Sequence, residues 1–179
     1  IRTLNIPPHK ITRTYMGIRP GLGPLPREKV ERVLRRLKLP ARYLLYLGTI
    51  EPRKNQRRLA EAFAGYLARG GEPMPLVLAG GEGWRMEDFP RALEELGVAG
   101  QVIVTGYVSD AELIWLYRNC YANLYPSLFE GFGLPPLEAM ACGTPVVTSR
   151  DSAMADVTGP AAVLVDPLDP RSIADGIDR

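Results

Sequence analysis

Apolar residues alternate along most of the chain between short continuous runs and sets with helical spacing. Six runs have the length of strands that are buried on both faces: residues 43–47, 76–79, 102–104, 122–125, 146–147 and 162–165. Between the runs, apolar residues recur every three or four positions, as in Val30, Val33, Leu34 and Leu37. Strands alternating with helices predict a parallel sheet. We therefore expect an α/β fold with a Rossmann-like, doubly wound parallel sheet over residues 26–179.

The first 25 residues have a different character. Prolines and glycines surround one short apolar stretch, from Ile11 to Met16. This pattern predicts a first strand followed by a loop, at the end of an interdomain linker. The chain begins at Ile1 without Met and ends at Arg179 inside a helical pattern, as expected of a segment taken from a longer protein.

Composition narrows the class of protein. The 179 residues are enough for one compact core, and a net charge of +2 gives no indication of a nucleic-acid partner. No apolar run reaches about 18 residues, so we expect no transmembrane segment and a cytoplasmic location. Cys120 and Cys142 are scattered and His9 is the single histidine, which argues against a zinc site and for cysteines that are small buried hydrophobes in a reducing compartment.

Ligands of such sheets bind at the carboxyl ends of the strands, which here lead into residues 48–56, 80–85, 105–109, 126–138 and 148–156. The first of these segments reads GTIEPRKN from Gly48 to Asn55. Arg53 and Lys54, next to the amides of a helix start, suit a diphosphate. The segment lacks the glycine spacing of a Walker A loop. The alternative is a helix start that simply carries exposed basic residues.

The segment after the fourth run holds two glutamates, Glu130 and Glu138, separated by seven residues. Gly131 and Gly133 lie between them and allow close backbone approach to a ligand, and the following helix start favours a phosphate. Carboxylates accept hydrogen bonds from sugar and ribose hydroxyls, so the pair suits a glycosylated nucleotide. The alternative is a loop acid at Glu130 and a helix-stabilising acid at Glu138.

The sequence EGFGLPPLE, followed by AMACGTPVV, resembles the signature of the retaining GT-B glycosyltransferases of family four. LGTIEPRKN is similar to the phosphate loop of that family, and LVLAGG, VIVTGYVSDAEL and CYANLYPSLFEGFG follow in the family's order. The resemblance runs from about Lys10 to the end of the chain. It implies the C-terminal half of a GT-B fold, which binds the nucleotide sugar, with the N-terminal acceptor domain missing.

The resemblance also implies roles for individual residues. Lys54 corresponds to the lysine at the donor diphosphate, Glu138 to the glutamate at the nucleotide ribose, and Glu130 to the glutamate at the hydroxyls of the transferred sugar. Glu130 is also the nearest candidate for a protein nucleophile, although we favour a binding role. Backbone contacts are implied for Gly48 in the phosphate loop, for Gly131, Phe132, Gly133 and Leu134 near the sugar and phosphate, and for Tyr107 and Val108 at the base.

Three positions depart from the family pattern. Thr49 stands where many members have an arginine, so either Arg53 supplies the second cation or one cation acts alone. Ala155 and Asp156 replace a Pro-Glu pair, which leaves Asp156 at most a loop-bracing role. The family's histidine near the acceptor lies on the other domain, and His9 does not correspond to it.

The implied reaction transfers a hexose, with retention, from a nucleoside diphosphate to an acceptor hydroxyl without a metal. Arg53, Lys54 and helix amides would stabilise the leaving group. The form GTIEPRKN resembles O-antigen and capsule mannosyltransferases, which favours GDP-mannose as the donor and places UDP-sugars next. The isolated chain should be inactive, and membrane contact, if any, would run through the missing domain. Two alternatives remain: a non-catalytic nucleotide-binding module, and a glycogen-phosphorylase-like enzyme, which would need a lysine for pyridoxal phosphate.

Overall fold

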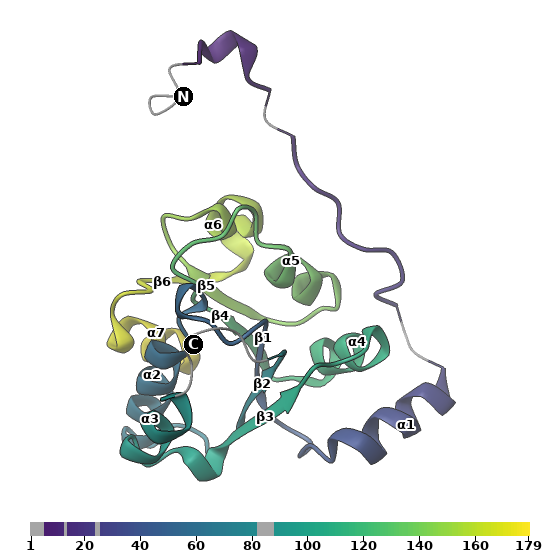
Figure 1. Cartoon of the computed structure of the whole chain (residues 1–179), viewed down its shortest axis with the longest axis vertical. Coiled ribbons are helices and arrows are strands. Elements are labelled where there is room, and N and C mark those ends of the chain that lie inside the picture. Colours follow the sequence, from purple (N-terminus) through teal and green to yellow (C-terminus); the bar gives the residue numbers. More distant parts are fainter. Residues whose placement is uncertain (1–5, 13, 24–25, 82–87) are drawn as a thin grey trace.

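A computed structural model describes residues 6–12, 14–23, 26–81 and 88–179. A six-stranded sheet forms the centre of the domain, with strand order β3-β2-β1-β4-β5-β6 and every pairing parallel (Figure 1). The strands are β1 (Leu44–Leu47), β2 (Leu76–Ala79), β3 (Val102–Gly106), β4 (Ala122–Tyr125), β5 (Val146–Ser149) and β6 (Val163–Val165). The predicted α/β, Rossmann-like sheet is confirmed, and each of the six apolar runs contributes one strand.

Helices precede, connect and follow the strands, and apolar spacing predicted all of them except the helix at residues 153–158. They are α1 (Arg27–Leu37), α2 (Gln56–Ala68), α3 (Phe89–Glu95), α4 (Asp110–Asn119), α5 (Leu134–Ala141), α6 (Ala153–Thr158) and α7 (Pro170–Asp178). Short 3₁₀ turns are η1 (Pro8–Lys10), η2 (Pro52–Lys54), η3 (Ala99–Gln101) and η4 (Gly159–Ala161). Helix α4 begins with a capping box between Ser109 and Glu112, which satisfies backbone N–H groups at the helix start.

The alternating side chains of β1 show why the sheet is covered on both faces. Leu44 and Tyr46 belong to a core cluster with residues of α2, α3 and α7. Leu45 and Leu47 belong to a second cluster with residues of α1, α4 and α5. Successive residues of a strand point to opposite faces, so a strand buried on both sides needs a continuous apolar run. Strand β1 is buried at all four positions, as this requires.

The strand expected over Ile11–Met16 is not found at residues 11–12 and 14–16, which are the described part of that stretch. Ile11, Tyr15 and Met16 are exposed, and Figure 1 shows residues 6–12 and 14–23 running outside the sheet. A strand is stable only when a neighbouring strand takes its backbone hydrogen bonds. The apolar pattern predicted an extended segment, but the described residues supply no neighbouring strand to pair with it.

Two smaller expectations concern the membrane and the cysteines. Within the described residues, no helix combines the length and the apolar character needed to cross a bilayer. Cys120 and Cys142 are free, and both are partly buried, whereas we expected them to be buried. Burial raises the pKa of the Cys120 thiol to about 12, so this cysteine is a thiol at neutral pH.

Candidate functional site

The candidate site lies where the strand order reverses. Strand β1 pairs with β2 on one side and with β4 on the other, so the connections after β1 and β4 leave the sheet next to each other. Their backbones touch, because the amide of Leu128 donates to the carbonyl of Arg53 at 3.0 Å. Open α/β sheets bind ligands at such a switch point. The fold therefore brings together segments 48–56 and 126–138, which the sequence identified separately.

Polar side chains hold the loop after β1 in one conformation. Asn55 adopts a left-handed backbone conformation at φ 67°, and its side-chain amide donates to the carbonyls of Pro126 at 2.9 Å and Pro167 at 2.7 Å. Gln56 is buried, and its side chain donates to the carbonyl of Thr49 at 2.8 Å. Buried amides with several partners rigidify the segment that carries them. As a result, Arg53 and Lys54 extend from a fixed turn at the carboxyl edge of the sheet.

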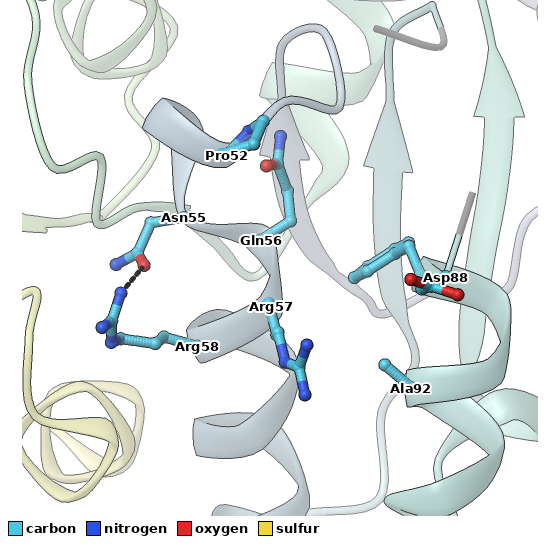
Figure 2. Close-up of a pocket in the computed structure, with 8 residues that line it drawn as sticks. Pro52, Asn55, Gln56, Arg57, Arg58, Asp88 and Ala92 are labelled. Carbon is cyan, nitrogen blue, oxygen red and sulfur yellow. Dashed lines mark hydrogen bonds between the residues drawn. The ribbon is translucent and has the colours of Figure 1, made fainter. Parts of the chain in front are cut away.

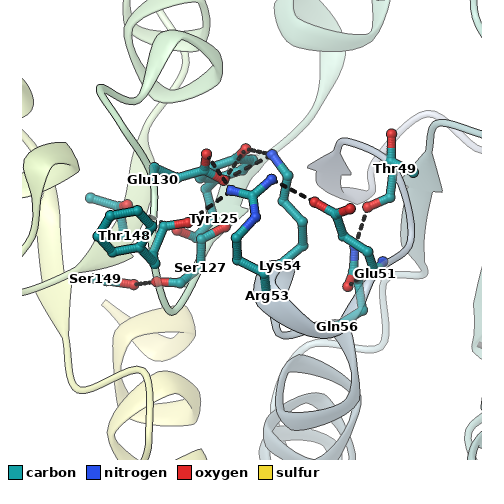
Figure 3. A network of polar contacts seen from close by, with 11 residues as sticks. Thr49, Glu51, Arg53, Lys54, Gln56, Tyr125, Ser127, Glu130, Thr148 and Ser149 are labelled. Carbon is teal, nitrogen blue, oxygen red and sulfur yellow. Dashed lines mark hydrogen bonds and ion pairs between the residues drawn. The ribbon is translucent and has the colours of Figure 1, made fainter. Parts of the chain in front are cut away.

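The charged side chains of the two loops form one cluster, shown in Figure 3. Arg53 donates through Nη1 to Glu130 Oε2 at 2.8 Å and through Nη2 to Glu51 Oε1 at 2.5 Å. Lys54 Nζ lies 2.8 Å from Glu130 Oε1 and also donates to the hydroxyl of Tyr125. The two cations and two carboxylates sum to zero charge. The three residues Arg53, Lys54 and Glu130 are thus brought together, but they pair with one another, which the sequence did not predict.

The carboxylate of Glu130 stays charged despite its surroundings. Burial acts to raise its pKa, but hydrogen bonding and charge from Lys54, with further hydrogen bonds from Arg53 and Tyr125, lower the pKa below its usual value. Ion pairing with Glu130 in turn raises the pKa of Arg53. At neutral pH the cluster therefore holds a carboxylate that only accepts hydrogen bonds, as a sugar hydroxyl requires.

The turn between the two glutamates needs glycine at Gly133. This residue has φ 111°, and a Cβ there would lie 2.8 Å from Cγ and 3.3 Å from Cα of Met154. By contrast, a Cβ on Gly131 would meet nothing within 4 Å. Helix α5 begins at Leu134, and its next two residues, Pro135 and Pro136, have no N–H. The helix start thus offers fewer amide donors for a phosphate than a helix without these prolines, so the nearby cations must supply more of the stabilisation.

Glu138 lies in α5 as predicted, but it is covered. Only 4% of the residue is exposed. Arg19 Nε donates to Oε1 of Glu138 at 2.7 Å, and the hydroxyl of Tyr117 donates to Oε2 at 3.3 Å. Arg19 also pairs with Asp110 at the start of α4, at 2.7 Å. A ribose that reaches this carboxylate must therefore displace or share the guanidinium of Arg19.

The residues expected at the base lie at the end of β3. Tyr107 is 78% exposed, whereas Val108 is buried in the core. The carbonyl of Tyr107 accepts a hydrogen bond of 2.8 Å from Arg36 Nη2, and Arg36 also pairs with Glu112 of the capping box. These contacts join the loop to α1 and α4 and fix the backbone of the loop. Of the neighbouring segment 80–85, residues 82–85 lie outside the described residues.

Two hollows adjoin the charged cluster without containing it. One, of about 280 Å³, lies between the start of α2 and α3, where Arg57 extends from α2 toward α3 (Figure 2). The other, of about 240 Å³, is lined by Tyr15, Gly131, Phe132 and Asp156 among others. Neither is lined by Lys54, Glu130 or Glu138. The candidate site is therefore defined by its convergent polar side chains and by its place at the switch point.

Two positions that the sequence singled out, Thr49 and Asp156, lie outside the charged cluster. Thr49 is exposed, and its carbonyl is bound by Gln56. Asp156 lies in α6, beside the second hollow.

Tyr125 and Arg19 contribute to the candidate site and were not predicted. The position of Tyr125 at the end of a buried strand on the ligand edge was a usable signal, whereas Arg19 lies 119 residues from Glu138 and no spacing indicates their contact.

Two comparisons with known proteins indicate the family. A family model described as glycosyl transferases group 1 matches residues 29–179. The chain is 37% identical over 175 residues to O-antigen chain mannosyltransferase B of Escherichia coli, which covers 97% of this chain and 46% of that relative. The chain thus spans about half the length of this curated relative.

Solved structures share the fold. The C-terminal domain of a group 1 glycosyl transferase (LpcC) from Francisella tularensis matches with a TM-score of 0.67 and 27% identity, over 82% of this chain and 79% of that one. Anabaena HepE, crystallised with UDP and glucose, matches with a TM-score of 0.72 and 20% identity, over 86% of this chain and 42% of that one. The second likeness is one of fold alone.

Proposed function

The chain belongs to the glycosyl transferases group 1 family, and from that premise we propose that residues 26–179 are the nucleotide-sugar-binding domain of a retaining glycosyltransferase. In this proposal residues 1–25 end the linker from an acceptor-binding domain. The observation that carries the proposal is the convergence of Arg53, Lys54 and Glu130 at the switch point of the sheet.

The proposed reaction joins an acceptor hydroxyl oxygen to the anomeric carbon as the bond from that carbon to the diphosphate breaks. The diphosphate leaves with the bonding electrons, and one of its oxygens takes the acceptor proton. Lys54 and Arg53 stabilise the negative charge that develops on the leaving group. Glu130 binds hydroxyls of the transferred sugar through Oε2, which among the described residues accepts only from Arg53, while Oε1 already accepts from Lys54 and Tyr125.

The nucleoside is proposed to bind along the edge toward α4 and α5. Glu138 accepts hydrogen bonds from the ribose, and the backbone of Tyr107 and Val108 meets the base. Two features support this direction: Glu138 lies in α5, which begins directly after the turn at Gly133 that follows Glu130, and the loop at Tyr107 is fixed by Arg36. Gly48, Gly131, Phe132 and Leu134 provide close backbone approach to the diphosphate and sugar.

We propose GDP-mannose as the donor, with UDP-sugars as the second choice. The support is the 37% identity to a protein named as a mannosyltransferase, over nearly the whole chain. The chain itself offers no cation at Thr49, so its diphosphate site depends on Lys54 and Arg53.

A binding screen tests the proposal. Titration calorimetry on this chain would compare GDP-mannose, UDP-glucose and ADP-glucose, each with its free nucleoside diphosphate. We expect GDP-mannose to bind most tightly and more tightly than GDP, because Glu130 adds contacts to the sugar. A non-catalytic nucleotide-binding module would bind GDP and GDP-mannose equally. Failure of all three donors to bind would refute the proposed function.

A further inference from the structure

The hydroxyl of Tyr125 lies between the two residues on which the proposed donor site depends. Lys54 Nζ donates a hydrogen bond to this hydroxyl, and the hydroxyl donates to Glu130 Oε1 at 3.0 Å. Lys54 Nζ and Glu130 Oε1 are themselves 2.8 Å apart. The three groups form a closed triangle of polar contacts, visible at the centre of Figure 3.

The ring of Tyr125 is held in place by its surroundings. It is fully buried and stacks on Tyr46, with centroids 5.5 Å apart and planes 9° from parallel. The hydroxyl of Thr148 donates to the Tyr125 carbonyl at 2.9 Å, which anchors the backbone. The ammonium of Lys54 lies 5.0 Å from the ring centroid. The tyrosine hydroxyl is therefore a fixed point, whereas the lysine stem beside it is flexible.

We propose that Tyr125 is a positioning residue, whose hydroxyl orients the ammonium of Lys54 toward the donor diphosphate and the carboxylate of Glu130 toward the donor sugar. The proposal rests on the proposed function of the same site. An ammonium has three N–H donors, and two of those of Lys54 point to Tyr125 and Glu130, which directs the third. The hydroxyl and the ammonium together occupy Oε1 of Glu130, so a sugar hydroxyl would donate to Oε2, which has room for it beside the hydrogen bond from Arg53.

A purely structural role for Tyr125 makes a different prediction. If only its ring mattered, Tyr125→Phe would keep the stacking and change nothing at Lys54 or Glu130. Tyr46 supplies a matched control, because its ring is the other member of the stacked pair and its buried hydroxyl has no hydrogen-bond partner in the part of the chain that the structure describes. Tyr46→Phe therefore removes the same atom from the neighbouring ring and breaks no described hydrogen bond.

The first measurement needs no ligand. The hydrogen bond from Tyr125 is one of the contacts that lower the pKa of Glu130. Carbon-13 NMR of the Glu130 carboxyl during a pH titration should therefore give a higher pKa in Tyr125→Phe than in the unsubstituted chain or in Tyr46→Phe. The same midpoint in all three proteins would overturn the proposal, whatever the domain binds.

The second measurement is calorimetry with GDP-mannose from pH 4 to pH 8. We expect Tyr125→Phe to bind about tenfold more weakly than the unsubstituted chain, and Tyr46→Phe to bind within about twofold. The loss of affinity on acidification should begin at a higher pH in Tyr125→Phe, because Glu130 is protonated earlier. Normal affinity in Tyr125→Phe, with weak binding in Lys54→Ala, would overturn the positioning role alone. Absence of any donor binding by the unsubstituted chain would instead overturn the proposed function, and the positioning role with it.

Discussion

Lys54 is the residue whose removal tests the site most directly. Its side chain is only 13% exposed, so a contact from its ammonium to a phosphate is weakly screened by salt. A hydrogen bond to a charged group contributes about 1.5–3 kcal/mol. Lys54→Ala should therefore weaken binding of the donor about tenfold to a hundredfold.

The place of Lys54 in the cluster also predicts which part of the ligand feels the loss. Its ammonium contacts Glu130, which we assign to the sugar, and so it should meet the phosphate next to the sugar. We expect a large loss of affinity for GDP and GDP-mannose and a small loss for GMP, which lacks that phosphate. Removing Lys54 also takes a counter-charge from Glu130, so the effect should be greatest for GDP-mannose.

Calorimetry with the three ligands, on Lys54→Ala and on a control variant, provides the assay. Lys29→Ala is the matched control, because Lys29 is an exposed lysine of α1 and the substitution is the same. Circular dichroism would verify that both variants keep the fold. Equal affinities for GDP in the two variants would remove Lys54 from the diphosphate site, and an equal loss for GMP and GDP would place it elsewhere on the nucleotide.

Two further changes test the cover over Glu138 and the turn before α5. Arg19→Ala should bind GDP up to about fivefold more tightly, because the nucleotide need not displace the 41%-exposed side chain of Arg19, whose pairing with Glu138 contributes about 0.2–1 kcal/mol; unchanged or weaker binding in calorimetry would show that Arg19 does not compete with the ribose. Gly133→Ala should lower the free energy of unfolding by roughly 1–3 kcal/mol, since its positive φ and the contact with Met154 both oppose a side chain. At about 2–4 °C per kcal/mol, differential scanning calorimetry should detect the lower melting temperature of Gly133→Ala, while Gly131→Ala, which meets nothing, should melt within about 1 °C of the unsubstituted chain.

The sheet could be predicted from sequence because each strand carries its own signal. The run around Leu44–Leu47 is apolar at every position, which is typical of a strand that is covered on both faces. The same local reasoning predicted a strand over Ile11–Met16, and residues 11–12 and 14–16 are not in one, because a strand also needs a partner and the sequence pattern cannot supply one. The local apolar pattern thus predicted the strands of the sheet, but it also predicted a strand in a segment that lies outside the sheet.

The loops that form the candidate site could be predicted from the sequence, whereas the ion pairs between their side chains could not. Glycines and charged residues at strand ends identified the loops around Lys54 and Glu130, and the parallel order of β1 and β4 explains why they meet. Two features remained out of reach: the pairing of Arg53 with Glu130, and the contact of Arg19 with Glu138. Both are tertiary ion pairs between residues 77 and 119 positions apart, and no periodicity in a single sequence encodes such a distance.

The inventory of charges at the edge predicts that donor binding needs no divalent cation. A hard cation such as Mg²⁺ or Mn²⁺ binds where several oxygen ligands gather. Across residues 6–12, 14–23, 26–81 and 88–179, no three acidic, histidine or cysteine side chains are grouped as a cation would require. The carboxylates that do lie near the cluster already have cationic partners, since Glu51 pairs with Arg53, Glu130 with Arg53 and Lys54, and Glu138 with Arg19.

The same cations are available to the diphosphate when the donor arrives. Lys54 can offer its third N–H to a phosphate oxygen while it keeps its contacts with Tyr125 and Glu130, so the leaving charge is stabilised by a side chain that is already in place. We expect this chain to bind GDP-mannose with the same affinity in excess EDTA and in millimolar magnesium or manganese, measured by calorimetry at fixed ionic strength. Lys54→Ala should lose affinity equally in both conditions. Binding that disappears in EDTA and returns only with the metal would mean that a bound cation, and not Lys54 with Arg53, holds the diphosphate.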